Sequence, residues 1–166
     1  MKNLFTLFFS LLLIGIAAQD KKLIQWKNLQ EGDSLQIHGD TRLLFVDIFT
    51  DWCGPCKFLD KYTFQNQEVS SYINENFIPV KFNAELKESV TFKGNTYDYI
   101  SNGQTGIQSW AYYALGGNLR YPSIALINKN GETVYVISGF MQPDEFLKTV
   151  KNVKSELDQN LAKDNR

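Results

Sequence analysis

Cys53 and Cys56, the two cysteines of the chain, are separated by only two residues, so they can close a small disulfide and reopen it. A dithiol that alternates with a disulfide carries two electrons, and this spacing therefore predicts redox chemistry. Half of a zinc site and an inert structural disulfide are the two alternatives. A single histidine and the absence of a second cysteine pair disfavour zinc, and so small a loop would stabilise a fold little.

The Cys-Gly-Pro-Cys run follows an apolar stretch, residues 43–49, whose length and Val, Ile and Phe content favour a buried strand. Pro55 then fits the first turn of a helix. At such a junction Cys53 would face unpaired N–H groups and the positive end of the helix dipole, which lowers the pKa of its thiol. We therefore predict that Cys53 attacks and that Cys56, one turn further on, resolves the mixed disulfide.

Asp47 lies six residues before Cys53, inside that otherwise apolar strand. An ionised carboxylate is costly to bury alone, so we expect the pKa of Asp47 to be raised. The alternative is an acid at a strand bend that is satisfied by the backbone.

The chain of 166 residues has the length of one domain, and its formal charge of −1 gives no basic field for nucleic acid. Residues 4–18 form an apolar run that ends in small residues and is followed by polar ones, which is the layout of a secretory signal peptide. We predict a signal peptide at 1–18 and a folded domain at 19–166. An uncleaved membrane anchor is the alternative.

The remaining pattern predicts strands and helices that alternate, and this requires a mixed sheet with helices on both faces. A hairpin with its turn at Gly94-Asn95 interrupts the order, and Pro143 is expected to open the last helix. The predicted strands are 22–26, 43–49, 78–83, 123–128 and 132–138, and the predicted helices are 28–38, 67–76 with Asn66 as its N-cap, and 107–115.

Several of these segments together resemble the thioredoxin superfamily. The resemblance implies an α/β class, with a three-layer α/β/α fold, a central mixed sheet, and an insertion at about 85–121 before the strand that follows a cis-proline. The matching runs are 46–49 (VDIF), 52–57 (WCGPCK), 80–83 (VKFN), 121–123 (YPS) and 129–132 (KNGE), with Gly139 after the last strand.

A closer resemblance runs through 51–53 (DWC) and 60–64 (DKYTF). These runs look like the C-terminal thioredoxin-like domain of the periplasmic thiol:disulfide interchange reductases. Those reductases carry a membrane electron-transfer domain, and this chain is expected to be a free-standing relative. The insertion is longer than the corresponding part of small thioredoxins.

The resemblance implies a role for each residue around the cysteines. Asp47 takes the proton of Cys56, and Lys81 neighbours this acid. Pro122 is cis and faces the two sulfurs, and the residue before it, Tyr121, pairs through its backbone with the substrate chain.

Three supporting residues complete the predicted site. We expect Trp52 to flank and shield the sulfurs, with packing in the core as the alternative, and we expect Gly54 and Pro55 to tune the stability of the reduced form. Gly-Pro is the pair found in reducing thioredoxins, so we expect a potential near the reducing end of the range from about −270 to about −120 mV.

The resulting prediction is an exported thiol:disulfide oxidoreductase, periplasmic in a Gram-negative cell and otherwise extracytoplasmic, that reduces protein disulfides with no cofactor beyond the Cys53–Cys56 pair. A reductant outside the cytosol needs an electron source, which implies a membrane electron-donor protein as partner. We expect a monomer that binds protein substrates, no nucleic acid and no metal. A disulfide isomerase or oxidase, or a non-enzymatic binding module, remains the alternative.

Overall fold

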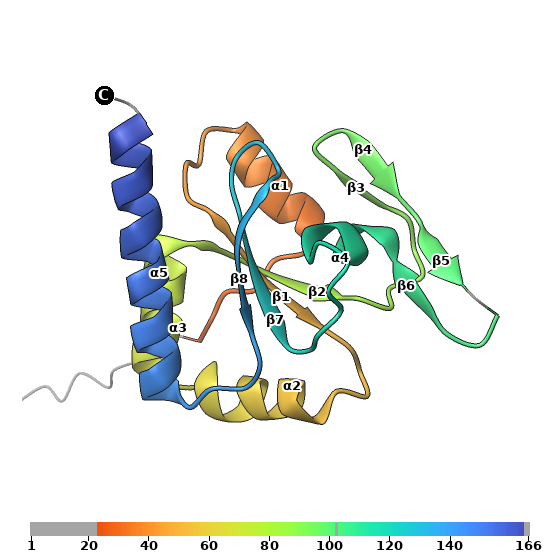
Figure 1. Cartoon of the computed structure of the whole chain (residues 1–166), viewed down its shortest axis with the longest axis horizontal. Helices are drawn as coiled ribbons and strands as arrows, with labels where there is room; N and C mark the ends of the chain where they lie inside the picture. The colour runs from red at the N-terminus through yellow and green to blue at the C-terminus, as the bar shows by residue number, and fades with distance from the viewer. Residues whose placement is uncertain (1–22, 102, 165–166) are drawn as a thin grey trace, which may run out of the picture.

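A four-stranded mixed sheet lies at the centre of the computed structural model, which describes residues 23–101 and 103–164 (Figure 1). Its strand order is β2-β1-β7-β8, with β1 parallel to β2 and antiparallel to β7, and β7 antiparallel to β8. This confirms the predicted sheet. The strands are β1 (Leu44–Phe49), β2 (Ile78–Asn83), β7 (Ser123–Ile127) and β8 (Thr133–Ser138).

The side chains of β1 alternate between two hydrophobic clusters, one on each face of the sheet. Val46 and Ile48 belong to the cluster on the first face, and Phe45 belongs to the cluster on the second. Helices cover both faces, as predicted. The first face carries α1 (Leu29–Ile37) and α4 (Ser109–Ala114), and the second carries α3 (Gln67–Asn76), α5 (Pro143–Asp164) and the π-helix η1 (Leu59–Thr63).

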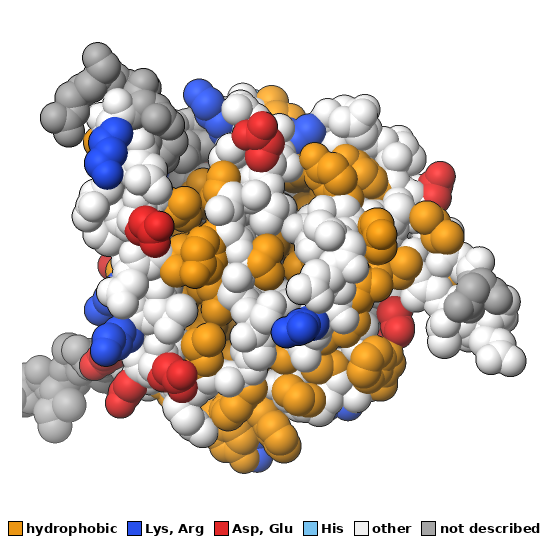
Figure 2. Space-filling model, viewed as in Figure 1, with side chains coloured by type: hydrophobic (Ala, Val, Ile, Leu, Met, Phe, Trp, Pro, Cys, Tyr) orange, Lys and Arg blue, Asp and Glu red, His pale blue; other side chains and the backbone are white. Residues whose placement is uncertain are grey.

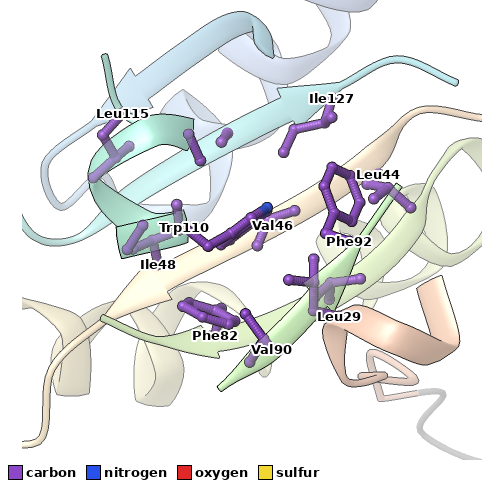
Figure 3. Close-up of a cluster of buried hydrophobic side chains, with 14 of the residues drawn as sticks. Leu29, Leu44, Val46, Ile48, Phe82, Val90, Phe92, Trp110, Leu115 and Ile127 are labelled. Carbon is purple, nitrogen blue, oxygen red and sulfur yellow. The ribbon is translucent and has the colours of Figure 1, made fainter. Parts of the chain in front are cut away.

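Trp110 of α4 is the largest fully buried side chain and fills the first face. Its ring lies 4.6 Å from that of Phe82 and 5.5 Å from that of Phe92, measured between centroids. Figure 3 shows this indole among the side chains of β1, β2 and β3. Trp110 thereby anchors the long segment between β2 and β7 to the sheet.

On the second face, α2 (Gly54–Phe58) continues directly into η1, and α3 follows. The N-cap of α3 is Asn66, as predicted, and its side-chain oxygen accepts hydrogen bonds from the N–H groups of Glu68 and Val69. Burial of Leu59 and Phe64 against Phe45 and its neighbours attaches this run of helices to the sheet.

The segment between β2 and β7, residues 85–121, forms two hairpins and α4. The predicted turn at Gly94-Asn95 is wrong by one residue: Lys93 and Gly94 form the turn, with φ of 49° and 76°, and Asn95 already pairs with Phe92. Asp33 of α1 explains the shift, because it accepts the backbone N–H of Lys93 and pairs with its ammonium. The strands are β3 (Val90–Phe92), β4 (Asn95–Tyr97), β5 (Tyr99–Ser101) and β6 (Gly106–Gln108).

Two further predictions are corrected. Residues 23–26 form no strand, because the Asn74 side chain accepts the Gln25 N–H and donates to the Leu23 carbonyl. Next to this segment, Lys27 makes an isolated bridge to Val80. The helix predicted at 107–115 begins at Ser109, since residues 107–108 pair with β5 in a hairpin that the sequence pattern did not reveal.

The predicted signal peptide at 1–18 lies outside the described residues. Within the described part of the chain, no helix has both the length and the apolar character needed to cross a bilayer.

Candidate redox site

The chain turns from β1 into α2 through a short loop that places both cysteines. The Thr50 carbonyl accepts a hydrogen bond from the Cys53 N–H at 3.2 Å, which closes the loop. Cys53 is the N-cap of α2, and its Sγ accepts the Cys56 N–H at 3.1 Å. Pro55 lies in the first turn, where a missing N–H costs the helix no hydrogen bond.

Cys53 and Cys56 form a disulfide in this structure, with Cα atoms 5.3 Å apart. They are 3% and 4% exposed, so burial does not distinguish the attacking sulfur from the resolving one. Hydrogen bonding distinguishes the two sulfurs, because the Cys56 N–H donates to the Cys53 sulfur. A donor in this position would stabilise a thiolate on Cys53 after reduction, which agrees with the predicted attacking role.

Asp47 and Lys81 are direct register partners on β1 and β2, and both belong to the second face, which α2 and η1 cover. Lys81 Nζ lies 3.4 Å from Asp47 Oδ2. Asp47 is 2% exposed, and this burial raises its pKa to about 7; the Lys81 charge opposes the shift, and the Asp60 charge adds to it. The carboxyl group can therefore change its protonation state near neutral pH.

Asp60 of η1 forms an ion pair with Lys81 from the other side, so one ammonium serves two carboxylates. Sequence reasoning placed Asp60 in a matching run without assigning it a role. Its position one helical turn beyond Cys56 was the one sequence feature that pointed to a place near the cysteines. The ion pair between Asp60 and Lys81, however, depends on a π-helical turn that no spacing rule predicts.

Trp52 directly precedes Cys53 in the chain, and its side chain is 67% exposed. Its Nε1 donates a hydrogen bond to Glu85 Oε1 at 2.9 Å, and its ring meets that of Tyr121 edge-on, with centroids 6.1 Å apart. Burial, with a smaller contribution from the Glu85 charge, raises the pKa of the Tyr121 phenol. The structure thus brings two predicted residues together and adds Glu85, which sequence reasoning missed.

Pro122 is buried, and the peptide bond that joins it to Tyr121 is cis. Its carbonyl accepts the Gly139 N–H at 2.9 Å. The next residue, Ser123, pairs with Ile48 near the end of β1. Pro122 therefore lies at the end of the sheet where β1 finishes and the loop to the cysteines begins.

Gly54, between the two cysteines, has open space where a side chain would start: beyond its chain neighbours and the backbone of α2, no described atom lies within 4 Å of an added Cβ. Figure 2 shows hydrophobic side chains exposed on the face that carries β8 and α4 and along the lower edge, where Figure 1 places α2. No three His, Cys, Asp or Glu side chains among the described residues are grouped closely enough to bind a metal ion.

Comparison with known families identifies the family to which the chain belongs. A model described as a thioredoxin-like domain matches residues 33–154, which include the cysteines, Asp47, Lys81 and Pro122. The chain belongs to the thioredoxin-like family. The Cys53–Cys56 disulfide, in its Cys-x-x-Cys motif, lies within the matched residues.

Two relatives match different lengths of the chain. The thiol:disulfide interchange protein DsbD of Photorhabdus laumondii is 30% identical over 54 residues, which are 32% of this chain and 9% of that protein. DsbD of Campylobacter jejuni is 22% identical over 116 residues, which are 70% of this chain and 17% of that protein. The chain thus spans less than a fifth of either DsbD.

Two solved structures share the thioredoxin-like fold. One is a putative disulphide-isomerase from Bacteroides thetaiotaomicron, 30% identical, with a TM-score of 0.55 over 80% of this chain and 93% of that one. The other is the DsbH oxidoreductase, 14% identical, with a TM-score of 0.57 over 80% of this chain and 85% of that one. At this identity DsbH supports the fold alone.

Proposed function

We propose that the chain is an exported reductase of protein disulfides that works through Cys53 and Cys56. The single observation that carries the proposal is the Asp47 carboxyl, buried on the face of the sheet beneath α2–η1 with a pKa of about 7. An acid that titrates near neutral pH can accept the proton that the resolving thiol must lose.

In the proposed cycle the reduced protein starts with a thiolate on Cys53 and a thiol on Cys56. The Cys53 thiolate attacks one sulfur of the substrate disulfide, and the other substrate sulfur leaves as a thiolate and takes a proton. Cys56 then gives its proton to Asp47, and its thiolate attacks Cys53 Sγ. The second substrate thiolate leaves and is protonated, so two electrons have passed to the substrate and the Cys53–Cys56 disulfide has formed.

Further turnover requires a dithiol donor that reduces this disulfide again. We propose a membrane electron-donor protein for this step, because the predicted export at residues 1–18 separates the chain from cytosolic reductants. The names of the DsbD relatives, which are interchange proteins, support a chain of dithiol exchanges. Export to the periplasm and a monomeric state are part of the proposal.

A redox titration tests the direction of electron flow. Equilibration of the Cys53–Cys56 pair with glutathione or dithiothreitol buffers should give a midpoint near the thioredoxin value of about −270 mV. A midpoint above about −180 mV, in the region of isomerases and oxidases, would overturn the reductase assignment.

Disulfide isomerisation is the second candidate, and the name of the Bacteroides relative favours it. The two activities separate in a paired assay. A reductase reduces insulin faster than it restores scrambled ribonuclease, whereas an isomerase shows the reverse order. The Cys53→Ser variant is the blank for both reactions.

A further inference from the structure

Both ends of the 85–121 segment meet at the Trp52 indole. Glu85, the first residue of the segment, accepts the hydrogen bond of Trp52 Nε1 at 2.9 Å. Tyr121, the last residue, contacts the ring edge-on at 6.1 Å. A tryptophan that is 67% exposed has few packing contacts to fix its rotamer, so these two interactions determine where the indole lies.

Glu85 itself is held by the end of β2. The side-chain oxygen of Asn83 accepts the Glu85 N–H at 2.8 Å, and its amide nitrogen donates to Asp51 Oδ2 at 3.2 Å. Ala84 donates to the Phe49 carbonyl and accepts from Gln108, both at 2.8 Å. Asp51, the residue before Trp52, and Phe49, at the end of β1, are therefore connected to the start of the segment through Asn83 and Ala84.

We propose that Glu85 is a positioning residue that holds Trp52 in place as a contact surface for protein substrates, and that this selects protein disulfides over small ones. The inference rests on the proposed function in taking a protein disulfide as the substrate. A fixed aromatic side chain binds a partner without losing rotamer freedom, whereas a mobile one must be ordered first. A small disulfide that reaches only the sulfurs gains little from Trp52.

Hydrogen bonding and charge are separated by two substitutions at the same position. Glu85→Gln keeps an oxygen that can accept the indole N–H but removes the charge, whereas Glu85→Ala removes both. Glu88→Ala is the matched control, because Glu88 is an exposed acid in the same segment. The proposal requires Glu85→Gln to resemble the wild type and Glu85→Ala to differ from it.

The first measurement is the ¹⁹F NMR spectrum of protein labelled with 5-fluorotryptophan, with the Trp52 resonance assigned from Trp52→Phe. In Glu85→Ala this resonance should move toward that of a free, solvated indole, while the Trp26 and Trp110 resonances stay in place. Glu85→Gln and Glu88→Ala should match the wild type. An unmoved Trp52 resonance in Glu85→Ala overturns the proposal, and this readout does not depend on the direction of electron flow.

The second measurement compares kcat/KM for insulin with the rate constant for a small disulfide such as hydroxyethyl disulfide. In Glu85→Ala the ratio of the two should fall by roughly threefold to tenfold, through a higher KM for insulin, which matches the ordering of one side chain. Equal losses with both substrates, or the same fall in Glu85→Gln, overturn the proposal. A wild-type protein that reacts with the small disulfide but not with insulin refutes the proposed function. The NMR measurement would then still report whether Glu85 holds the Trp52 indole in place.

Discussion

Lys81 Nζ lies 3.4 Å from Asp47 Oδ2, and the two residues face each other as register partners on parallel strands. The other carboxylate oxygen, Asp47 Oδ1, has no hydrogen-bond partner among the described residues. A buried carboxylate with one oxygen paired and the other unpaired retains an acceptor for a proton. This arrangement gives the site a base whose strength its neighbours determine.

Asp47→Asn should slow the resolving step at pH 8 by about 100-fold or more, because general-base assistance is worth that much. Single-turnover mixing of the reduced protein with a peptide disulfide, from pH 5.5 to 8.5, measures the rate. In the wild type the rate should rise with a midpoint near pH 7, and the rise should be absent in the variant.

The control for that experiment is Asp33→Asn. Asp33 is also a buried aspartate paired with a lysine, Lys93, but it lies on α1, over the other face of the sheet. Its substitution should leave the pH profile intact. A shared profile for wild type and Asp47→Asn would remove Asp47 from the proton transfer.

Stability should respond to the same substitution with a definite sign. The folded-state pKa of Asp47 is raised from 3.8 to about 7, so its contribution to stability is fully present below about pH 4 and is lost as the pH rises to about 7. Relative to Asp47→Asn, the wild type should lose about 1.4 kcal/mol per pH unit across that window, roughly 4 kcal/mol in total. Urea unfolding of the oxidised proteins at pH 4.5 and pH 8 should show roughly 3 kcal/mol of this loss, and a difference that is independent of pH would contradict the assignment.

Lys81→Met and Asp60→Asn should move the pH profile in opposite directions. The Lys81 charge lowers the pKa of Asp47 and the Asp60 charge raises it, so loss of the lysine raises the pKa and loss of Asp60 lowers it. We expect a shift of about one unit for Lys81→Met, and a smaller one for Asp60→Asn because the Asp60 side chain is 43% exposed and screened by solvent. The carboxyl ¹³C shift of Asp47 reports both values, and shifts in the same direction would exclude this electrostatic account.

Cys56→Ser should trap a mixed disulfide with the substrate through Cys53, whereas Cys53→Ser should trap none. The reason is the asymmetric hydrogen bond from the Cys56 N–H to the Cys53 sulfur, which stabilises a thiolate on Cys53. Non-reducing electrophoresis followed by mass spectrometry identifies the trapped partner. Equal trapping by both variants would mean that either sulfur can attack.

Local sequence signals predicted the parts of the fold that local interactions determine. Asn66 caps α3 with its own side chain, and the apolar run of β1 is buried on both faces, so each could be identified without the rest of the chain. The redox pair and Asp47 were predictable for the same reason, since their spacing within one strand, loop and helix is fixed by the chain.

Long-range contacts were not predictable in this way. The Asn74 side chain forms hydrogen bonds with the backbone of Leu23 and Gln25, in a segment that was predicted to be a strand. Asp33 accepts the Lys93 N–H and so determines where the β3–β4 hairpin turns. Asp60 and Glu85 join the site through contacts across 21 and 33 residues of sequence. Neither contact follows from periodicity, because each depends on how separate elements pack together.

The two hydrophobic clusters share no residue, and the sheet separates them. Trp110 and the 85–121 segment belong to one side, whereas Asp47, Lys81 and η1 belong to the other. The sheet therefore separates the packing of the 85–121 segment from the Asp47–Lys81 pair. Substitutions in the 85–121 segment can therefore leave the packing around Asp47 and Lys81 untouched.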